Sequence, residues 1–307
     1  MTASYIALQK TGKLKRRADK ASAMLASCAV CPRECKVDRL AGELGKCRTG
    51  SHAIISSYGP HFGEEPPLVA GGGSGTIFFT NCNLKCVYCQ NYSISQLGQG
   101  DEASADKLST IMLYLQTKGC RNINLVSPSH VVPQILEALI IAVDKGLTMP
   151  LVYNSGGYDS VKTLELLDGV VDIYMPDMKY GDGQTAKRLS GIDDYPETNR
   201  QAIKEMHRQV GDLIIEDGIA THGMLIRHLV LPGGLAGTES VMRFIAEEIS
   251  TNSYLNIMDQ FRPEYKAYDV AQLSRPLRMQ EWSDAMELAK RCGLTRIAHP
   301  QPRLRLI

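Results

Sequence analysis

The chain has 307 residues, of which 44% are hydrophobic and 22% are charged, and this composition excludes a disordered or a fibrous protein. The formal net charge of +1 excludes a strong overall field, so neither nucleic acid nor a membrane surface is expected as a partner. The first residues lack the apolar core of a secretory signal and no run of about 18 apolar residues occurs, which predicts a cytoplasmic location. Nine cysteines in such a protein indicate metal or redox chemistry rather than disulfides.

Residues 1–70 differ from the rest of the chain, and we interpret them as an N-terminal extension. They contain a basic helical stretch, a cysteine-rich segment and then a region with turn-forming Pro and Gly. The cysteines follow the pattern C-x2-C-x3-C-x11-C and are Cys28, Cys31, Cys35 and Cys47. Four thiolates complete a coordination shell, so this group suits a structural zinc ion or an electron-relaying iron–sulfur cluster. The sequence leaves that choice open, and His52 is a weaker candidate ligand.

A regular alternation of elements begins after the glycines at 71–73 and occupies residues 71–307. Short apolar runs bounded by turn formers predict buried strands at 76–80, 123–126, 151–153, 171–175, 225–231 and 254–258. Helical spacing predicts helices at 105–118, 131–145, 238–250 and 281–292. This alternation predicts an α/β fold with a mostly parallel sheet, either an incomplete barrel or an open doubly wound sheet.

Polar or glycine-rich segments follow directly after the predicted strands. In parallel α/β folds, ligands and catalytic groups gather at the carboxyl ends of the strands. We therefore expect six segments to meet on one face, at 81–91, 127–130, 154–157, 176–179, 232–234 and 259–263.

The first of these segments carries the strongest chemical signal. Cys82, Cys86 and Cys89 are spaced C-x3-C-x2-C on a loop that follows a predicted strand. Thiolates suit zinc and iron–sulfur clusters. A four-iron cluster normally takes four cysteines, so three local ligands leave one iron open to substrate. The alternative is a zinc site that takes its fourth ligand from His130 or Cys120; otherwise Cys120 and Cys292 are expected to be buried core thiols.

Tyr88, which precedes the last of these cysteines, completes a motif that resembles the signature of the radical S-adenosylmethionine (SAM) superfamily. The resemblance extends over residues 75–265. Within the superfamily the chain is similar to the activating enzymes of pyruvate formate-lyase, and above all to their uncharacterised iron–sulfur homologues. Those homologues have a similar early cysteine-rich stretch and a segment like 61–67. The resemblance implies a partial (β/α)6 barrel in residues 71–307, preceded by the cysteine-rich extension of residues 1–70.

The resemblance also implies roles for individual residues. Cys82, Cys86 and Cys89 match the ligands of the catalytic [4Fe-4S] cluster, and Tyr88 matches the aromatic residue beside the cluster and adenine. Other matches lie at the ends of the third, fourth and fifth strands, where the family binds SAM and a nearby monovalent cation. These residues are Asn154, Ser155, Met175, Asp177, Lys179 and Arg227. An Asp and a Lys two positions apart also occur as a simple surface ion pair, and Asn154 also fits a plain turn.

Two positions depart from the family pattern. The family grips the amino group of methionine with a Gly-Gly-Glu type motif after the second strand, whereas this chain has Ser129 and His130 there. We expect the hydroxyl and the imidazole to bind the amino group instead. The sixth strand is followed by Gln260 rather than by the histidine of the activating enzymes, so the chemistry on the substrate side is expected to differ.

The reaction that the resemblance implies is reductive cleavage of SAM at the cluster. The resulting 5′-deoxyadenosyl radical takes hydrogen from a substrate, with Cys82, Cys86, Cys89 and Lys179 as the catalytic residues. The expected substrate is a polypeptide, and the expected electron donor is a reduced protein of the flavodoxin or ferredoxin type. Two alternatives remain at this point: radical modification of a small metabolite, and a non-catalytic zinc or electron-transfer protein.

Overall fold

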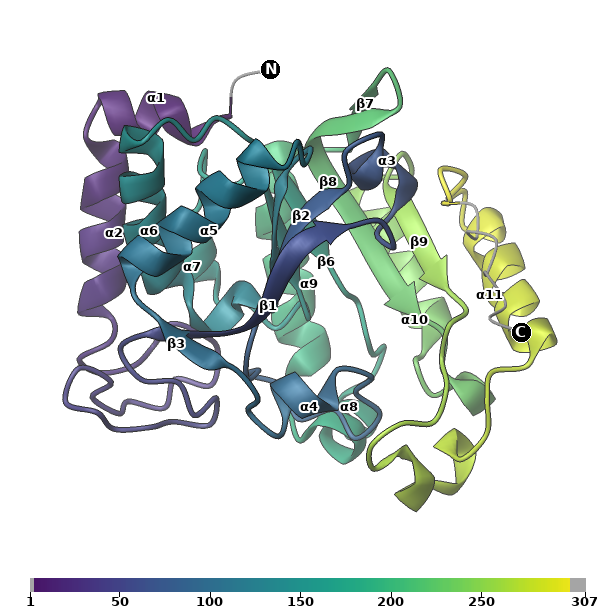
Figure 1. Ribbon diagram of the computed structural model, residues 1–307. Helices are drawn as coiled ribbons and strands as arrows, with labels where there is room; N and C mark the ends of the chain where they lie inside the picture. The colour runs from purple at the N-terminus through teal and green to yellow at the C-terminus, as the bar shows by residue number, and fades with distance from the viewer. Residues whose placement is uncertain (1–2, 299–307) are drawn as a thin grey trace.

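The structure is a computed structural model that describes residues 3–298 (Figure 1). Its centre is a run of parallel strands that pair in the order β2-β4-β5-β6-β8-β9. This is the sheet of a partial barrel, as the resemblance implied. The strands are β2 (Ser74–Phe79), β4 (Ile123–Val126), β5 (Leu151–Ser155), β6 (Ile173–Pro176), β8 (Ile219–Leu229) and β9 (Tyr254–Met258).

Each of the six strands predicted from the sequence is confirmed, with shifts at the ends. The strands β4 and β5 are almost completely buried, which explains why they read as continuous apolar runs rather than as alternating patterns. The largest shift is in β8, which begins six residues before the predicted position at 225. Its early part pairs with the short strand β7 (Ile214–Glu216), which the sequence analysis did not predict.

The extension contributes to the same sheet. Strand β1 (Ala53–His61) pairs antiparallel with β2, and its start also pairs with β3 (Asp101–Ala103). Gly59 and Pro60, which belong to the Pro- and Gly-containing region of the extension, both lie in β1. Pro60 is tolerated there because β3 pairs only with the first residues of β1, so this part of the strand lies at the edge of the sheet.

The helices cover the outside of the sheet. The predicted helices correspond to α5 (Ala105–Thr117), α6 (Val132–Asp144), α10 (Thr238–Phe244) and α11 (Met279–Arg291), and α10 continues as a π-helical turn to Ile249. In the extension, α1 (Tyr5–Lys10) is followed by α2 (Lys13–Ala23), which lies beside α6 (Figure 1). Leu14, Ala18 and Ala21 form the buried face of α2, so its basic residues remain on the outer face.

Between β5 and β7 the structure has three helices that were not predicted. These are α7 (Val161–Glu165), α8 (Gly183–Ser190) and α9 (Tyr195–Val210). Helix α8 begins at a conventional cap, because the side chain of Asp182 accepts a hydrogen bond from the backbone N–H of Thr185. Helix α9 is amphipathic but mostly polar, so its apolar face is difficult to recognise from the sequence.

A short helix fills the interior of the partial barrel. Helix α3 (Pro66–Val69) follows β1, and its residue Leu68 is completely buried. Leu68 belongs to a cluster with inward-facing residues of the strands, among them Val152, Ile173 and Leu225. Burial of one leucine side chain contributes about 1.5–3 kcal/mol, so this contact helps to fix α3 inside the sheet. No helix within residues 3–298 has the length and apolar character needed to cross a membrane.

Candidate functional site

The carboxyl ends of the strands surround one cavity. Four of the six segments predicted to meet there line it, whereas 232–234 and 259–263 do not. Its lining includes all three cysteines of the C-x3-C-x2-C loop, together with strand-end residues of β4, β5, β6 and β8. The polar and sulfur-containing residues of this lining are Cys82, Cys86, Cys89, Asn91, Ser95, Gln96, Ser127, Asn154, Ser155, Asp177, Lys179 and Arg227. The structure therefore brings together residues that lie up to 145 positions apart, from Cys82 to Arg227.

Each of the three cysteine sulfurs faces a hydrogen-bonding group. The backbone N–H of Leu84 donates to Cys82 Sγ at 3.4 Å, and Ser190 Oγ donates to Cys86 Sγ at 3.0 Å. Cys89 Sγ and Ser95 Oγ lie 3.1 Å apart. Hydrogen bonds to sulfur stabilise thiolate ligands and tune the clusters that they hold. Ser95 lies in the short helix α4 (Tyr92–Ser95) and Ser190 ends α8, and the sequence analysis identified neither residue.

The end of α8 also positions the backbone of the cysteine loop. The N–H of Lys85 donates to Ser190 O at 3.3 Å, and the N–H of Val87 donates to Leu189 O at 2.8 Å. The last carbonyl groups of a helix lack partners inside the helix, so these bonds satisfy groups that would otherwise need water. The loop is thus attached to a rigid element on either side of Cys86.

An ion-paired array also lines the cavity. Asp177 Oδ1 accepts from Arg227 Nε at 2.9 Å, and Asp177 Oδ2 accepts from Lys179 Nζ at 2.5 Å. Arg227 also donates from Nη2 to Asn154 Oδ1 at 2.7 Å. The side chains of Asp177 and Lys179 are only 12% and 17% exposed, so this is not the surface ion pair considered as an alternative.

The protonation states in this array follow from its charges. Burial acts to raise the pKa of Asp177, but Arg227 and Lys179 outweigh it, so this pKa lies below its usual range. Burial acts to lower the pKa of Lys179, but the attraction of Asp177 and Cys86 outweighs it and raises this pKa to about 12. Lys179 therefore keeps its positive charge at neutral pH, and Asp177 keeps its negative charge.

Helix α9 holds the loops after β5 and β6 together. Tyr195 Oη donates to Gly156 O at 2.8 Å, and Asn199 Nδ2 donates to the carbonyl oxygens of Gly157 and Asp177 at 2.9 and 3.0 Å. Gly157 has a φ of 74°, and a Cβ atom there would lie 2.0 Å from Asp177 O. Only glycine fits at this position. Tyr195 and Asn199 are further residues of the site that the sequence analysis did not identify.

The comparison with known families identifies this arrangement. The sequence pattern of the Radical SAM superfamily matches residues 76–245, which is more than half of the chain. The chain belongs to the radical SAM superfamily. It is also 34% identical over 295 residues to an uncharacterized protein of Methanocaldococcus jannaschii, an alignment that covers 93% of this chain and 80% of that protein.

A solved radical SAM structure shares the fold. The methyltransferase TsrM from Kitasatospora setae, solved with tryptophan and a SAM analogue, has a TM-score of 0.51 and 12% identity, covering 75% of this chain and 55% of TsrM. A radical SAM methyltransferase from Sphaerobacter thermophilus has a TM-score of 0.48 and 12% identity, covering 71% of this chain and 64% of that enzyme. The chain thus spans less than two thirds of either solved enzyme. The similarity to TsrM shows the partial barrel fold.

Membership in the radical SAM superfamily implies a [4Fe-4S] cluster and SAM as cofactors, and the donor set of the cavity fits both. Three sulfurs with hydrogen-bond donors suit a cluster that leaves one iron open. Burial raises the pKa of Cys82 to about 12 and also raises that of Cys89, so metal binding must release protons from these thiols. Within residues 3–298, no three Cys, His, Asp or Glu side chains already surround a single metal position. The family and the donor chemistry carry the cluster assignment, rather than a preformed ligand geometry.

Two carboxylates lie beside the radical SAM cavity and were not assigned from the sequence. Glu64 and Glu65 precede α3, and their carboxylate oxygens lie 3.9 and 4.0 Å from Arg227 Nη1. Glu65 also accepts from Asn256 Nδ2 at 2.9 Å. Burial raises the pKa of Glu64 to about 7, opposed by Arg227 and assisted by Glu65. A continuous charged column therefore runs from Lys179 through Asp177 and Arg227 to these two residues.

The predicted contact of Ser129 and His130 with the amino group of methionine is not supported by their positions. Both are buried outside the cavity lining. His130 Nε2 lies 3.0 Å from Thr80 O, and burial lowers the pKa of His130 to about 4, so the ring is neutral. Ser129 lies in the short helical turn Pro128–His130 and is only 4% exposed. Ser127 lies in the cavity instead and has a left-handed φ of 59°.

Tyr88, also predicted from the sequence, lies close to the cavity without lining it. Tyr88 donates a hydrogen bond to Tyr180 Oη at 2.7 Å and packs edge-on against Phe261, in an apolar cluster that includes Cys86.

The cysteines outside the cavity differ in exposure. Cys120 is buried, as expected of a core thiol, whereas Cys292 is partly exposed. Cys28, Cys31 and Cys47 are buried and Cys35 is partly exposed.

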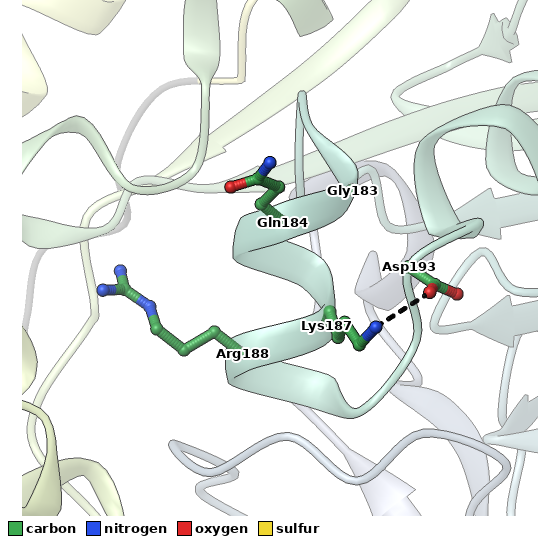
Figure 2. Close-up of a pocket in the computed structure, with 5 residues that line it drawn as sticks. All are labelled: Gly183, Gln184, Lys187, Arg188 and Asp193. Carbon is green, nitrogen blue, oxygen red and sulfur yellow. Dashed lines mark hydrogen bonds and ion pairs between the residues drawn. The ribbon is translucent and has the colours of Figure 1, made fainter.

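A separate depression lies on the outer side of α8. It is lined by Gly183, Gln184, Lys187, Arg188 and Asp193 (Figure 2). Lys187 Nζ and Asp193 Oδ2 form an ion pair at 3.3 Å, while Arg188 points away from Asp193 (Figure 2). Both members of that pair are about 70% exposed, so the pair contributes little to stability. No cysteine lines this depression, so it is distinct from the radical SAM cavity.

Proposed function

We propose that this radical SAM enzyme takes a hydrogen atom from a polypeptide substrate, in the manner of the activating enzymes of pyruvate formate-lyase. The observation that carries the proposal is the cavity that combines three thiols with the array of Asp177, Lys179 and Arg227. Three thiols alone would also suit a non-catalytic, structural metal site. A buried array of fixed charges in the same cavity suits a polar cofactor such as SAM, because these charges orient a zwitterionic group.

The roles of the residues follow from their positions. Cys82, Cys86 and Cys89 would hold the cluster, and Lys179 would present a fixed positive charge to the carboxylate of the bound SAM. Asp177 keeps Lys179 and Arg227 in place, and Arg227 in turn orients the amide of Asn154. When bound, the reduced cluster and SAM supply the 5′-deoxyadenosyl radical that removes hydrogen from the substrate. The protein contributes orientation and the exclusion of competing reactions.

The open sheet supports a large substrate. Among the described strands, β9 pairs with β8, and an isolated bridge joins its Leu255 to Ile297; the opposite edge of the sheet is the short strand β3. No strand pairing closes the barrel between these two edges, and this is the side from which we expect a peptide segment to approach the carboxyl ends of the strands.

A label-transfer experiment tests the choice of substrate. The reduced enzyme and SAM are incubated with size-fractionated lysate from cells grown on deuterated glycine, and the 5′-deoxyadenosine formed is examined for deuterium. We expect label from the high-mass fraction. The triple variant C82A/C86A/C89A serves as the control and should give no labelled product. Label that comes from the low-mass fraction alone would show that the substrate is a small metabolite.

We further propose that a reduced flavodoxin- or ferredoxin-type protein delivers the electron near α8. This helix carries Lys187 and Arg188 on its outer side, and its last residue, Ser190, donates to Cys86 Sγ at 3.0 Å. A basic surface complements an acidic carrier and accelerates its association. Charge reversal in K187E/R188E should slow reduction by the protein donor at least tenfold and leave reduction by dithionite unchanged. Equal slowing with both reductants would contradict docking at α8.

A further inference from the structure

The four cysteines of the extension lie in an irregular but tightly held segment. No helix or strand occurs between α2 and β1, yet Cys28, Cys31 and Cys47 are at most 7% exposed. The N–H of Cys28 donates to Val37 O at 2.9 Å, and the N–H of Lys36 donates back to Cys28 O at 3.0 Å. These bonds fold residues 28–37 into a compact loop, which brings the first three cysteines close together.

The backbone of this segment packs closely around its sulfurs. Among the residues that the structure describes, no three of these thiols yet surround one metal position, so metal binding would draw them together. The N–H of Lys46 donates to Cys35 Sγ at 3.4 Å. A Cβ atom on Gly45 would lie 2.8 Å from the same sulfur, so the backbone approaches Cys35 as closely as glycine allows.

An unusual buried cation lies against this group. Arg39 is only 1% exposed, and its guanidinium donates to Gly50 O, to His130 O at 2.9 Å and to Cys28 Sγ at 3.9 Å. None of the ion pairs within residues 3–298 includes Arg39. A buried charge without an opposite charge costs several kcal/mol. The chemistry of the surroundings therefore calls for an anion beside Cys28.

We propose that Cys28, Cys31, Cys35 and Cys47 bind a metal centre as an anionic tetrathiolate, with Arg39 as its counter-charge. Four thiolates carry a charge of about −4, so either Zn²⁺ or a [4Fe-4S]²⁺ core leaves the centre about twofold negative. On binding, the four S–H protons pass to solvent as the four metal–sulfur bonds form. The carbonyl groups around Arg39 orient the guanidinium, and the centre supplies the negative charge that they lack.

This second centre would be attached directly to the loop that holds the catalytic cysteines. Arg33, between Cys31 and Cys35, donates to Asn83 O at 3.0 Å. Arg48, next to Cys47, donates to Asn81 Oδ1 at 3.2 Å, and Asn81 Nδ2 donates to Thr49 Oγ1 at 3.2 Å. A metal centre that orders the extension therefore also fixes the backbone on both sides of Cys82.

Metal analysis of the triple variant C82A/C86A/C89A tests the proposal without depending on SAM chemistry. We expect about one zinc ion or about four iron ions per chain to remain, and elemental analysis with the absorption spectrum distinguishes the two. Adding C31S or C47S should remove this metal, whereas adding C120S, at a buried cysteine outside both groups, should not. A metal-free triple variant would overturn the proposal. Unchanged metal content after C31S and C47S would overturn it as well.

The role of Arg39 has its own test in the same triple variant. R39K keeps the charge, R39M removes it, and R121M removes an exposed arginine that also donates to a backbone carbonyl. In competition with a chelator, R39M should lose the metal at a chelator concentration at least tenfold lower, while R39K and R121M remain close to the parent. Hydrogen exchange of residues 24–50 in the metal-loaded parent and after chelation gives a second readout. Equal chelator sensitivity of R39M and its parent would refute the counter-charge, and exchange unaffected by metal removal would refute the link to the fold.

Discussion

Glu64 provides a quantitative test of the charged column inside the partial barrel. Its pKa is raised from the ordinary value of 4.5 to about 7, chiefly by burial, so the folded state binds this proton more tightly than the unfolded state. Stability from this group is fully present below pH 4.5 and is lost as the pH rises through 7. With these two values, the free energy of unfolding should fall by about 2 kcal/mol between pH 5.5 and pH 8.5.

The variant E64Q should remove this dependence. Glutamine keeps the shape of the side chain without an ionisable group, so E64Q should be about 2 kcal/mol less sensitive to pH than the wild type over this range. Denaturant unfolding of the anaerobic protein at each pH measures the difference, and E287Q on the exposed face of α11 is the matched control. Parallel pH profiles for E64Q and the wild type would refute the view that Glu64 is held protonated by burial.

Other predictions concern the cavity itself. Replacing Cys82, Cys86 or Cys89 by Ala should abolish formation of 5′-deoxyadenosine and remove the cluster iron. Full activity in any one of these variants would refute the assignment of the three cysteines as cluster ligands. D177N should destabilise the protein by about 3–5 kcal/mol, because it removes the carboxylate that the buried Lys179 and Arg227 share, and denaturant unfolding measures this cost. S190A should lower the reduction potential of the cluster, because it removes a hydrogen bond to Cys86 Sγ, and a redox titration followed by EPR detects the change.

The sequence predicted the parallel strands and the meeting of their ends because these features are local. Buried strands leave short apolar runs, and the polar segments follow each run directly. Ser190 could not be found in this way. It lies 104 positions from Cys86, and only the packing of α8 against the cysteine loop brings the two together.

The misplacement of Ser129 and His130 has a different cause. The position after the second strand was correct, but the chain turns at Ser127, whose left-handed backbone sends the following residues into the interior. Sequence spacing fixes where a loop begins and not which of its side chains faces the cavity. Glu64 and Glu65 show the same limit, because nothing local indicates that α3 enters the barrel.

The position of α3 limits the routes by which SAM and the substrate can reach the cavity. Because Leu68 and its neighbours pack the barrel beneath the strand ends, we expect SAM and the proposed polypeptide to reach the cavity from the carboxyl ends of the strands. A polypeptide bound there would cover SAM that had bound before it. We therefore expect ordered binding, with SAM entering first and its products leaving after the polypeptide.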